Sequence, residues 1–219
     1  MRSSGIWKRE GRMKKLKIKD VVLVALLTAL YMVFYMVGAM GSMLFGAFGH
    51  AISPGICAFL GGSVILFMSR KVGRFGQYTI MVAIVMLLCA LMGGGYLPWL
   101  ITSMVSAVLA DLIASGSNRT PVWRVAVASG IMHVGQAWGA IIPSWFFLEQ
   151  YKKDWIARGQ SPKKMDSMVK ATQGIMGGLA SVVVFLLAFA GVWLGYYILR
   201  KHLEKTIGSD VKEGHGKAA

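Results

Sequence analysis

Six long apolar stretches constrain this chain more than any other feature of its sequence. Most of them approach the ~20 residues that an α-helix needs to cross a bilayer. Hydrophobic residues make up 56% of the 219 residues and charged residues only 15%, and a soluble protein of this size could not bury so many helices that are apolar all round. We therefore predict an all-α, multi-pass membrane protein of the bacterial plasma membrane, with spans at 20–38, 51–68, 78–92, 98–114, 121–147 and 175–199.

The predicted membrane domain, an integral membrane bundle of six transmembrane helices, covers 20–203. A basic segment, 1–19, precedes it, and a polar tail, 204–219, follows it. Eight of the 24 lysine and arginine residues lie before residue 20, and five more follow Leu199. Because cytoplasmic segments carry the excess of lysine and arginine, both termini are predicted to be cytoplasmic. Basic ends beside membrane spans are typical of contact with the anionic lipid bilayer, and no nucleic-acid partner is predicted.

One loop departs from this charge pattern. Residues 148–172 are predicted to lie outside, yet they hold six basic residues against Glu149, Asp154 and Asp166. The even number of spans and the other basic segments still place this loop outside. Two interpretations are open, since the positive surplus could face an anionic substrate or the segment could be a solvated helical lid.

The fifth predicted span carries three polar residues on one face. Ser129, His133 and Gln136 follow the i, i+4, i+7 spacing of a helix. Such groups are costly in hydrocarbon unless they face protein, water or a ligand. We interpret this face as one wall of a small-molecule site, and the alternative is that the three groups only bond neighbouring helices.

Polar stripes on other predicted helices meet this face at a similar depth. At 1.5 Å per residue, Ser106 lies about 12 Å below Pro98 and His133 lies about 18 Å above Pro121. Both levels fall in the outer half of a hydrocarbon core about 30 Å thick. Polar groups converging among aromatic residues describe a mostly apolar pocket, although serines in membrane helices often bond only their own backbone. The predicted substrate-binding residues are His50, Ser53, Tyr96, Trp99, Ser103, Ser106, Ser129, His133 and Gln136.

Two pairs of small residues are spaced to allow close helix packing. Ala25 and Ala29 lie in the cytoplasmic half of the first span, and Gly191 and Gly195 lie in the last span. Small residues four apart let another helix backbone approach closely. For the glycine pair we predict packing inside the bundle, and the alanine pair is a candidate contact with another protein.

Asp111 is the only carboxylate well inside a predicted span. It lies about 20 Å below Pro98, in the inner half of the membrane and away from the predicted pocket. A proton relay is one interpretation of such a residue. We favour the other interpretation, in which Asp111 pairs with a basic group near the inner surface.

Residues suited to chemistry are sparse. His50 and His133, with Met40 and Met43, could ligate haem or a soft metal, but their spacing is not that of a defined site, so no metal site and no cofactor are predicted. The two cysteines suggest neither a disulfide framework nor a metal cluster. No paired carboxylates and no nucleotide-binding loop are present, so we predict no enzyme activity and ATP hydrolysis only in partner subunits.

Three motifs of the chain resemble a known family. KIKDVVLVALLTALYMV, GHAISPG and VLADLIA are similar to the MptD or Trep_Strep group of substrate-binding S components of energy-coupling factor (ECF) transporters, over most of residues 14–205. The resemblance implies an S component of an ABC importer that binds a small vitamin-like nutrient from outside. Its implied partners are a transmembrane coupling subunit (the T component) and two ATP-binding subunits.

The resemblance also implies roles for particular residues. Ala25 and Ala29 would dock on the coupling subunit, and the outer loops after the first and third spans would close over the site. Gly38, Gly41, Gly46 and Gly93 to Gly95 are the predicted flexible points of these gates. The alternatives are an S component for haem or metal uptake, a membrane enzyme without transport activity, and an assembly protein.

Overall fold

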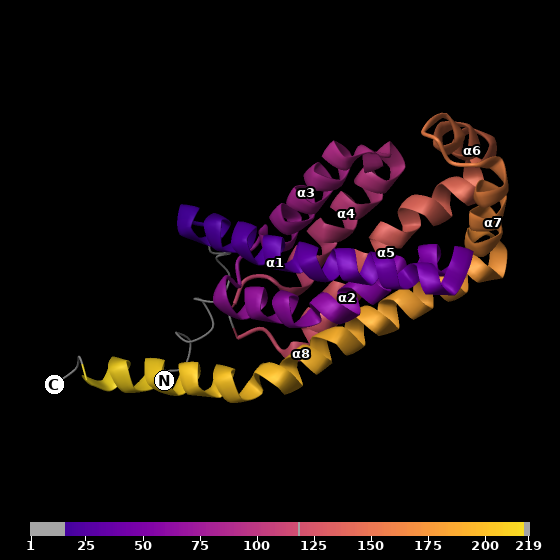
Figure 1. The fold of residues 1–219 in the computed structure, drawn as a ribbon. Helices are drawn as coiled ribbons and strands as arrows, with labels where there is room; N and C mark the ends of the chain where they lie inside the picture. The colour runs from indigo at the N-terminus through magenta and orange to yellow at the C-terminus, as the bar shows by residue number, and fades with distance from the viewer. Residues whose placement is uncertain (1–15, 118, 217–219) are drawn as a thin grey trace, which may run out of the picture.

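The computed structural model describes residues 16–117 and 119–216, with side chains up to Arg200. The described residues form helices and no strands, which confirms the all-α prediction (Figure 1). Most of the predicted basic segment 1–19 lies outside the described residues. The elements are α1 (Ile18–Ser42), the 3-10 helix η1 (Met43–Phe45), α2 (Gly46–Lys71), α3 (Gln77–Cys89), the π-helix η2 (Ala90–Gly94), α4 (Leu97–Ala114), α5 (Val122–Phe146), α6 (Leu148–Ala157), α7 (Pro162–Thr172) and α8 (Gly174–Gly216).

Five helical segments of the described chain are long and apolar enough to cross a membrane. They are Ile18–Lys71, Gln77–Gly94, Leu97–Ala114, Val122–Phe146 and Gly174–Arg200. The first is 54 residues long and contains α1, η1 and α2, so the count of six spans stays a prediction, as does the cytoplasmic placement of the termini. Large apolar side chains cover the outer surfaces of these helices, as lipid contact requires.

The glycine-rich segment after the first predicted span is helical, and the prediction of a loop there was wrong. α1 continues through Gly38 to Ser42, and α2 begins at Gly46 rather than at residue 51. Gly38 packs closely against α2, because a Cβ atom at this position would lie 2.9 Å from the Cα of Cys57. Among the predicted gate glycines, only Gly46 and Gly93 have positive φ angles, 59° and 88°. These two positions are where the backbone reverses.

Polar contacts tie together one end of the bundle. The carboxylate of Asp20, at the start of α1, pairs with Arg74 at 3.0 Å in the link between α2 and α3. Arg70 donates to the carbonyl of Thr120 at 2.6 Å, and the N–H of Gly116 donates to the carbonyl of Gly73 at 3.0 Å. The start of α1, the link between α2 and α3, and the link between α4 and α5 therefore lie at the same end (Figure 1).

Asp111 lies near this end, as a cap of α3. Its carboxylate accepts hydrogen bonds from the backbone N–H groups of Tyr78 and Thr79, the hydroxyl of Thr79 and the hydroxyl of Ser115, at 2.6 to 3.1 Å. These four donors are neutral, whereas we predicted a pair with a basic group. A carboxylate at a helix N-terminus is stabilised by the unpaired N–H groups and by the helix dipole. Asp111 therefore has a structural role that accounts for its burial.

Glycines bring α2 and α8 into close contact. A Cβ atom on Gly191 would lie 2.5 Å from the Cα of Phe59, and one on Gly195 would lie 2.5 Å from the Cα of Ser63. Gly62 of α2 faces the backbone of Gly191 in the same way. The pair Gly191 and Gly195 thus packs inside the bundle, as predicted.

The substitution Gly191→Ala should lower the stability of the protein. The added methyl group would force the backbones of α2 and α8 apart, at a cost of about 1–3 kcal/mol in the free energy of unfolding. Thermal unfolding of the purified protein in detergent measures this loss. Gly178→Ala on the same helix is the control, since no atom lies within 4 Å of its Cβ position. Equal melting temperatures for the two variants would contradict the close contact.

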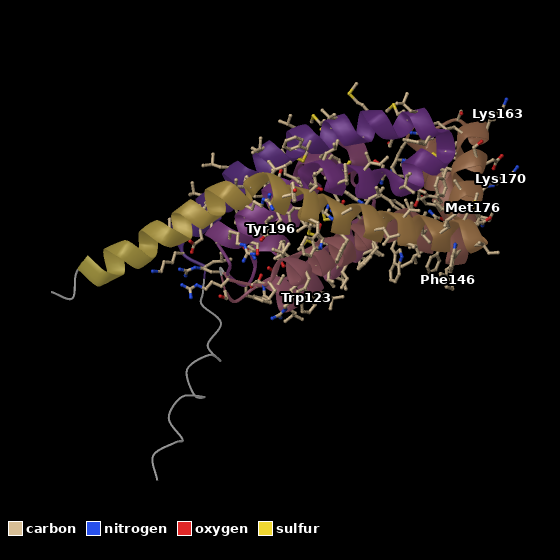
Figure 2. All side chains as sticks on the ribbon, turned by 90° about the horizontal axis from the view of Figure 1, so that it is seen from below. Trp123, Phe146, Lys163, Lys170, Met176 and Tyr196 are labelled. Atoms are coloured by element: carbon tan, nitrogen blue, oxygen red, sulfur yellow. The ribbon has the colours of Figure 1, made fainter. Side chains whose placement is uncertain are left out.

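Two short helices, α6 and α7, cover the opposite end of the bundle (Figures 1 and 2). They are amphipathic, and their buried side chains include Tyr151, Met165 and Met168. Lys152 of α6 pairs with Asp166 of α7 at 2.7 Å, and this partner holds the pKa of Asp166 below its usual value. Segment 148–172 is therefore a helical cover whose apolar face packs on the bundle.

Candidate functional site

Two adjoining cavities lie beneath and beside the helical cover. The inner cavity, of about 210 Å³, lies between α2, α4, α5 and α6. The outer cavity, of about 760 Å³, lies between the turn joining α1 to α2 and the start of α7. Tyr35, His50, Ser53 and Trp155 line both, so the two cavities form one candidate site.

Aromatic side chains form much of the inner cavity. The ring of Tyr96 lies 5.6 Å from that of Tyr151 and 5.7 Å from that of Trp155, measured between centroids. Trp99 of α4 also lines this cavity. Tyr96 is buried and lies near Asp154, and both effects raise the pKa of its phenol, so it is neutral at physiological pH. An apolar ligand or an aromatic ring would find a matching surface here.

Two buried polar atoms of the inner cavity have no protein partner within the described residues. They are the amide oxygen of Gln136, a residue only 4% exposed, and the indole nitrogen of Trp155. Leaving a buried donor or acceptor unpaired costs about 1–3 kcal/mol. Most buried polar groups in proteins are paired, so these two atoms mark a surface suited to a hydrogen-bonding ligand.

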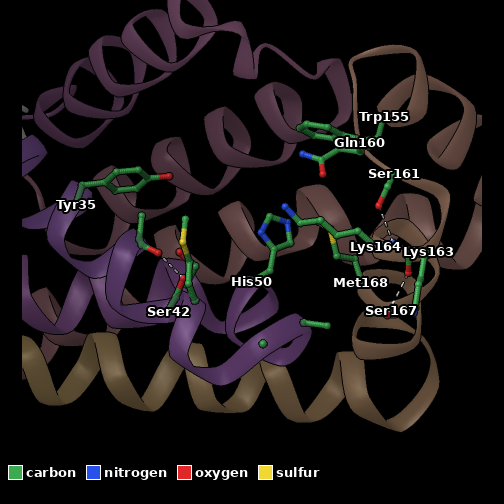
Figure 3. A pocket seen from close by; sticks show the side chains of 15 residues that line it. Tyr35, Ser42, His50, Trp155, Gln160, Ser161, Lys163, Lys164, Ser167 and Met168 are labelled. Carbon is green, nitrogen blue, oxygen red and sulfur yellow. Dashed lines mark hydrogen bonds between the residues drawn. The ribbon is translucent and has the colours of Figure 1, made fainter.

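Polar and basic groups dominate one wall of the outer cavity. Ser161, Lys163, Lys164 and Ser167 come from the start of α7, and no carboxylate is among the lining residues. Ser161 caps α7 by accepting from the N–H of Lys164 at 3.3 Å. Figure 3 shows the amine of Lys164 directed across the cavity toward the imidazole of His50. The site is therefore apolar and aromatic within and positively charged at its outer part.

Five of the nine predicted substrate-binding residues line the inner cavity, namely His50, Ser53, Tyr96, Trp99 and Gln136. The other four, Ser103, Ser106, Ser129 and His133, line neither of the two cavities. The helical spacing correctly put Ser129, His133 and Gln136 toward the inside of the bundle, and all three are buried. A shared helix face, however, spans several turns, and only its outer end reaches the cavity.

His133 is held inside the helix bundle by two hydrogen bonds. Its Nδ1 lies 2.7 Å from the carbonyl oxygen of Ser129, and its Nε2 lies 2.7 Å from the hydroxyl of Tyr31. Since a carbonyl only accepts, Nδ1 donates to it, and Nε2 accepts from the Tyr31 hydroxyl. Nε2 thereby joins α5 to α1 and Nδ1 bonds within α5, so both ring nitrogens are used, as the alternative interpretation of this polar face expected.

The serines of the predicted stripe lie at the contact between α4 and α5. The hydroxyl of Ser106 donates to backbone carbonyls of Ser103 and Met132 and lies against Gly135. The hydroxyl of Ser103 is buried and has no hydrogen-bond partner within the described residues. Ser103 and Ser106 therefore support helix packing. Their depth along the helix could not distinguish them from residues that line the cavity.

The substitution His133→Phe should destabilise the protein without weakening ligand binding. It removes the acceptor of the buried Tyr31 hydroxyl, at a cost of about 1–3 kcal/mol in the free energy of unfolding. The double variant Tyr31→Phe/His133→Phe should recover part of this loss, because it leaves no unpaired hydroxyl. Thermal unfolding with and without ligand measures both effects. Weaker ligand binding without loss of stability would show that His133 belongs to the binding site.

The cover contributes site residues that the sequence analysis missed. Trp155, Gln160 and Lys164 lie in segment 148–172, which the prediction treated only as a lid or charged surface. Tyr35 of α1 was also missed, although it lines both cavities. A tryptophan in a polar segment rich in lysine was the available signal, because such a large apolar side chain needs a packing surface.

Ala25 and Ala29 lie on an exposed face of α1. Val24 and Thr28 point into the bundle and are buried, whereas both alanines are exposed. Leu26, which is 65% exposed, extends this face. The alanine pair is therefore available for contact with another helix.

Within residues 16–117 and 119–200, no three histidine, cysteine, aspartate or glutamate side chains gather closely enough to hold a metal ion. His50 lines the cavities, and His133 is joined to Tyr31 and Ser129. The two histidines that the sequence offered as haem or metal ligands thus have different surroundings.

The chain matches the model of a known protein family. A family described as "Hypothetical bacterial integral membrane protein (Trep_Strep)" matches residues 18–205. No curated protein and no solved structure matches the chain.

Proposed function

Because the chain belongs to the Trep_Strep family of bacterial integral membrane proteins, we propose that this multi-pass membrane protein is the substrate-capturing S component of an ECF-type importer. In this role it binds a small vitamin-like nutrient from outside and docks on a transmembrane coupling subunit that works with two ATP-binding subunits. The family description supports membrane residence, and the importer role is our inference from the site.

The inner cavity is the observation that carries this proposal. The unpaired amide oxygen of Gln136 and the unpaired indole nitrogen of Trp155 lie among aromatic rings, in a cavity of about 210 Å³. An apolar site with a few orienting polar groups is the usual form of a small-molecule site. Its position under α6 and α7 suits capture from the side that we predict to be outside.

The exposed face of α1 supports the second half of the proposal. Ala25 and Ala29 leave a shallow surface on which a helix of the coupling subunit can pack closely. We infer that ATP hydrolysis occurs in the partners and that this chain performs no chemistry itself.

Binding and uptake measured separately test this function. The purified chain in lipid nanodiscs is screened for thermal stabilisation by vitamins, nucleobases, haem and divalent metal ions. Liposomes containing the chain alone, or the chain with its coupling and ATP-binding subunits, are then tested for uptake. We expect binding by the chain alone and uptake only with all partners and ATP. Active uptake by the chain alone, or no bound compound at all, would overturn the proposal.

A further inference from the structure

We infer that the ligand of this site is a small flat organic anion, with a ring system in the inner cavity and a carboxylate or phosphate group beside Lys164 and His50 in the outer cavity. This inference rests on the proposed function and specifies the substrate class. Three independent features of the two cavities lead to it.

The first feature is the set of aromatic side chains in the inner cavity. Tyr96, Trp99 and Trp155 present rings to a space of about 210 Å³. Aromatic pairs favour offset or tilted arrangements and add to the gain from apolar burial. A flat ring would contact several of these rings at once, whereas a branched aliphatic chain would gain burial without the added attraction between aromatic rings.

The second feature is the pair of unpaired polar atoms. The oxygen of Gln136 accepts a hydrogen bond, and the indole N–H of Trp155 can only donate one. A ligand that satisfies both needs a donor and an acceptor. Heteroaromatic rings with N–H, hydroxyl or carbonyl substituents carry both kinds of group, and a plain hydrocarbon ring carries neither.

The third feature is the distribution of charge on the cover. Lys152 is paired with Asp166, and the guanidinium group of Arg158 stacks on the rings of Tyr96 and Trp155 at 5.9 and 5.5 Å. No side chain of the described residues pairs with the amines of Lys163 and Lys164. These two lysines border the outer cavity, which has no carboxylate in its lining.

The position of Lys164 makes it the main anion contact. Its amine points toward His50, on the side shared with the inner cavity, and the Gln160 amide lies beside the Trp155 indole (Figure 3). A lysine amine offers three donors to a carboxylate or phosphate oxygen. The serine hydroxyls of Ser53 and Ser161 line the same space and can donate further hydrogen bonds. A cationic ligand would meet repulsion from both lysines.

A retention experiment tests the charge and the shape of the ligand. The purified chain in nanodiscs is incubated with an extract of bacterial small molecules below about 1 kDa, washed, and the retained compounds are identified by mass spectrometry. We expect a retained compound with a planar ring and a carboxylate or phosphate group. Lys164→Glu should reduce its retention at least about tenfold, as expected for loss of a charge-assisted contact, and Lys164→Arg should keep most of it.

Lys170→Glu is the matched control, because it makes the same charge change on the same helix outside both cavities. It should leave retention unchanged. A retained compound that is neutral, cationic or not planar would overturn this inference while leaving the proposed function intact. So would equal retention by the wild type and Lys164→Glu. If the wild type retains no compound, both the inference and the proposed function fail.

Discussion

Replacing Ala29 with phenylalanine should abolish ATP-driven uptake and leave ligand binding by the isolated chain unchanged. Ala29 is exposed on α1, so the larger side chain meets no obstacle within the chain itself. In the proposed complex, the added ring would separate α1 from a helix of the coupling subunit, and close packing of small residues would be lost. Uptake by the reconstituted complex and binding by the chain alone measure the two halves of this prediction.

Two controls make the result specific to the alanine face. Ala29→Ser keeps the residue small and should preserve uptake. Val105→Phe adds bulk to an exposed position of α4, which is 56% exposed, and should also preserve uptake. If Ala29→Phe transports as well as Val105→Phe does, α1 does not dock through this face. If Ala29→Phe also loses binding, the substitution has disturbed the fold, and Ala25→Phe becomes the test of the face.

Replacing Gln136 with leucine should weaken ligand binding by about 10- to 100-fold, the factor expected when one or two hydrogen bonds are lost. The same change should raise the free energy of unfolding of the ligand-free protein by about 1 kcal/mol, because it removes a buried polar group that has no protein partner. A substitution that weakens binding and raises stability is typical of a residue whose role is to bind a ligand. Isothermal titration and thermal unfolding measure the two quantities.

Ser103→Ala is the matched control for Gln136→Leu. The hydroxyl of Ser103 is also buried without a hydrogen-bond partner in the described residues, but it lines neither of the two cavities. This variant should gain stability in the same way and bind ligand as the wild type does. An assembly protein without a ligand would show the stability gain in both variants and no binding in either. Unchanged ligand binding by Gln136→Leu would show that Gln136 does not contact the ligand.

The variants Gln136→Leu, Lys164→Glu and Ala29→Phe separate the steps of the proposed cycle. Gln136→Leu acts on the inner cavity, Lys164→Glu acts on the outer cavity, and Ala29→Phe acts on an exposed position of α1 that lines neither cavity. The first two should reduce binding and therefore uptake, whereas the third should reduce only uptake. A protein that works by another mechanism is not expected to show this separation of binding defects from uptake defects.

Sequence reasoning reached the general architecture because lipid imposes strong rules. A helix satisfies its own backbone hydrogen bonds, and an apolar stretch of this length has few other stable states. The same reasoning gave the internal packing of Gly191 and Gly195. It failed at Gly38, where glycine content suggested a loop, because this part of α1 is helical and packs closely against Cys57 of α2.

The candidate site could be predicted only in part. Helical periodicity identified Gln136 and other residues near the helix ends under α6 and α7, but it treated His133 and Gln136 alike. Tyr31 makes the difference between the two residues, because its hydroxyl donates a hydrogen bond to Nε2 of His133. Tyr31 lies about 100 residues earlier in the chain, on another helix. No local pattern shows such a partner.

The sequence by itself therefore determined that this chain is an all-helical membrane protein, because hydrophobicity and segment length act locally along the chain. Only the tertiary structure decided which polar residues pair with each other and which remain available to a ligand. It also brought Trp155 and Lys164 of the cover to the same cavity as His50 of α2. Those contacts join residues far apart in the chain, and they depend on how the helices pack rather than on the composition of any one of them.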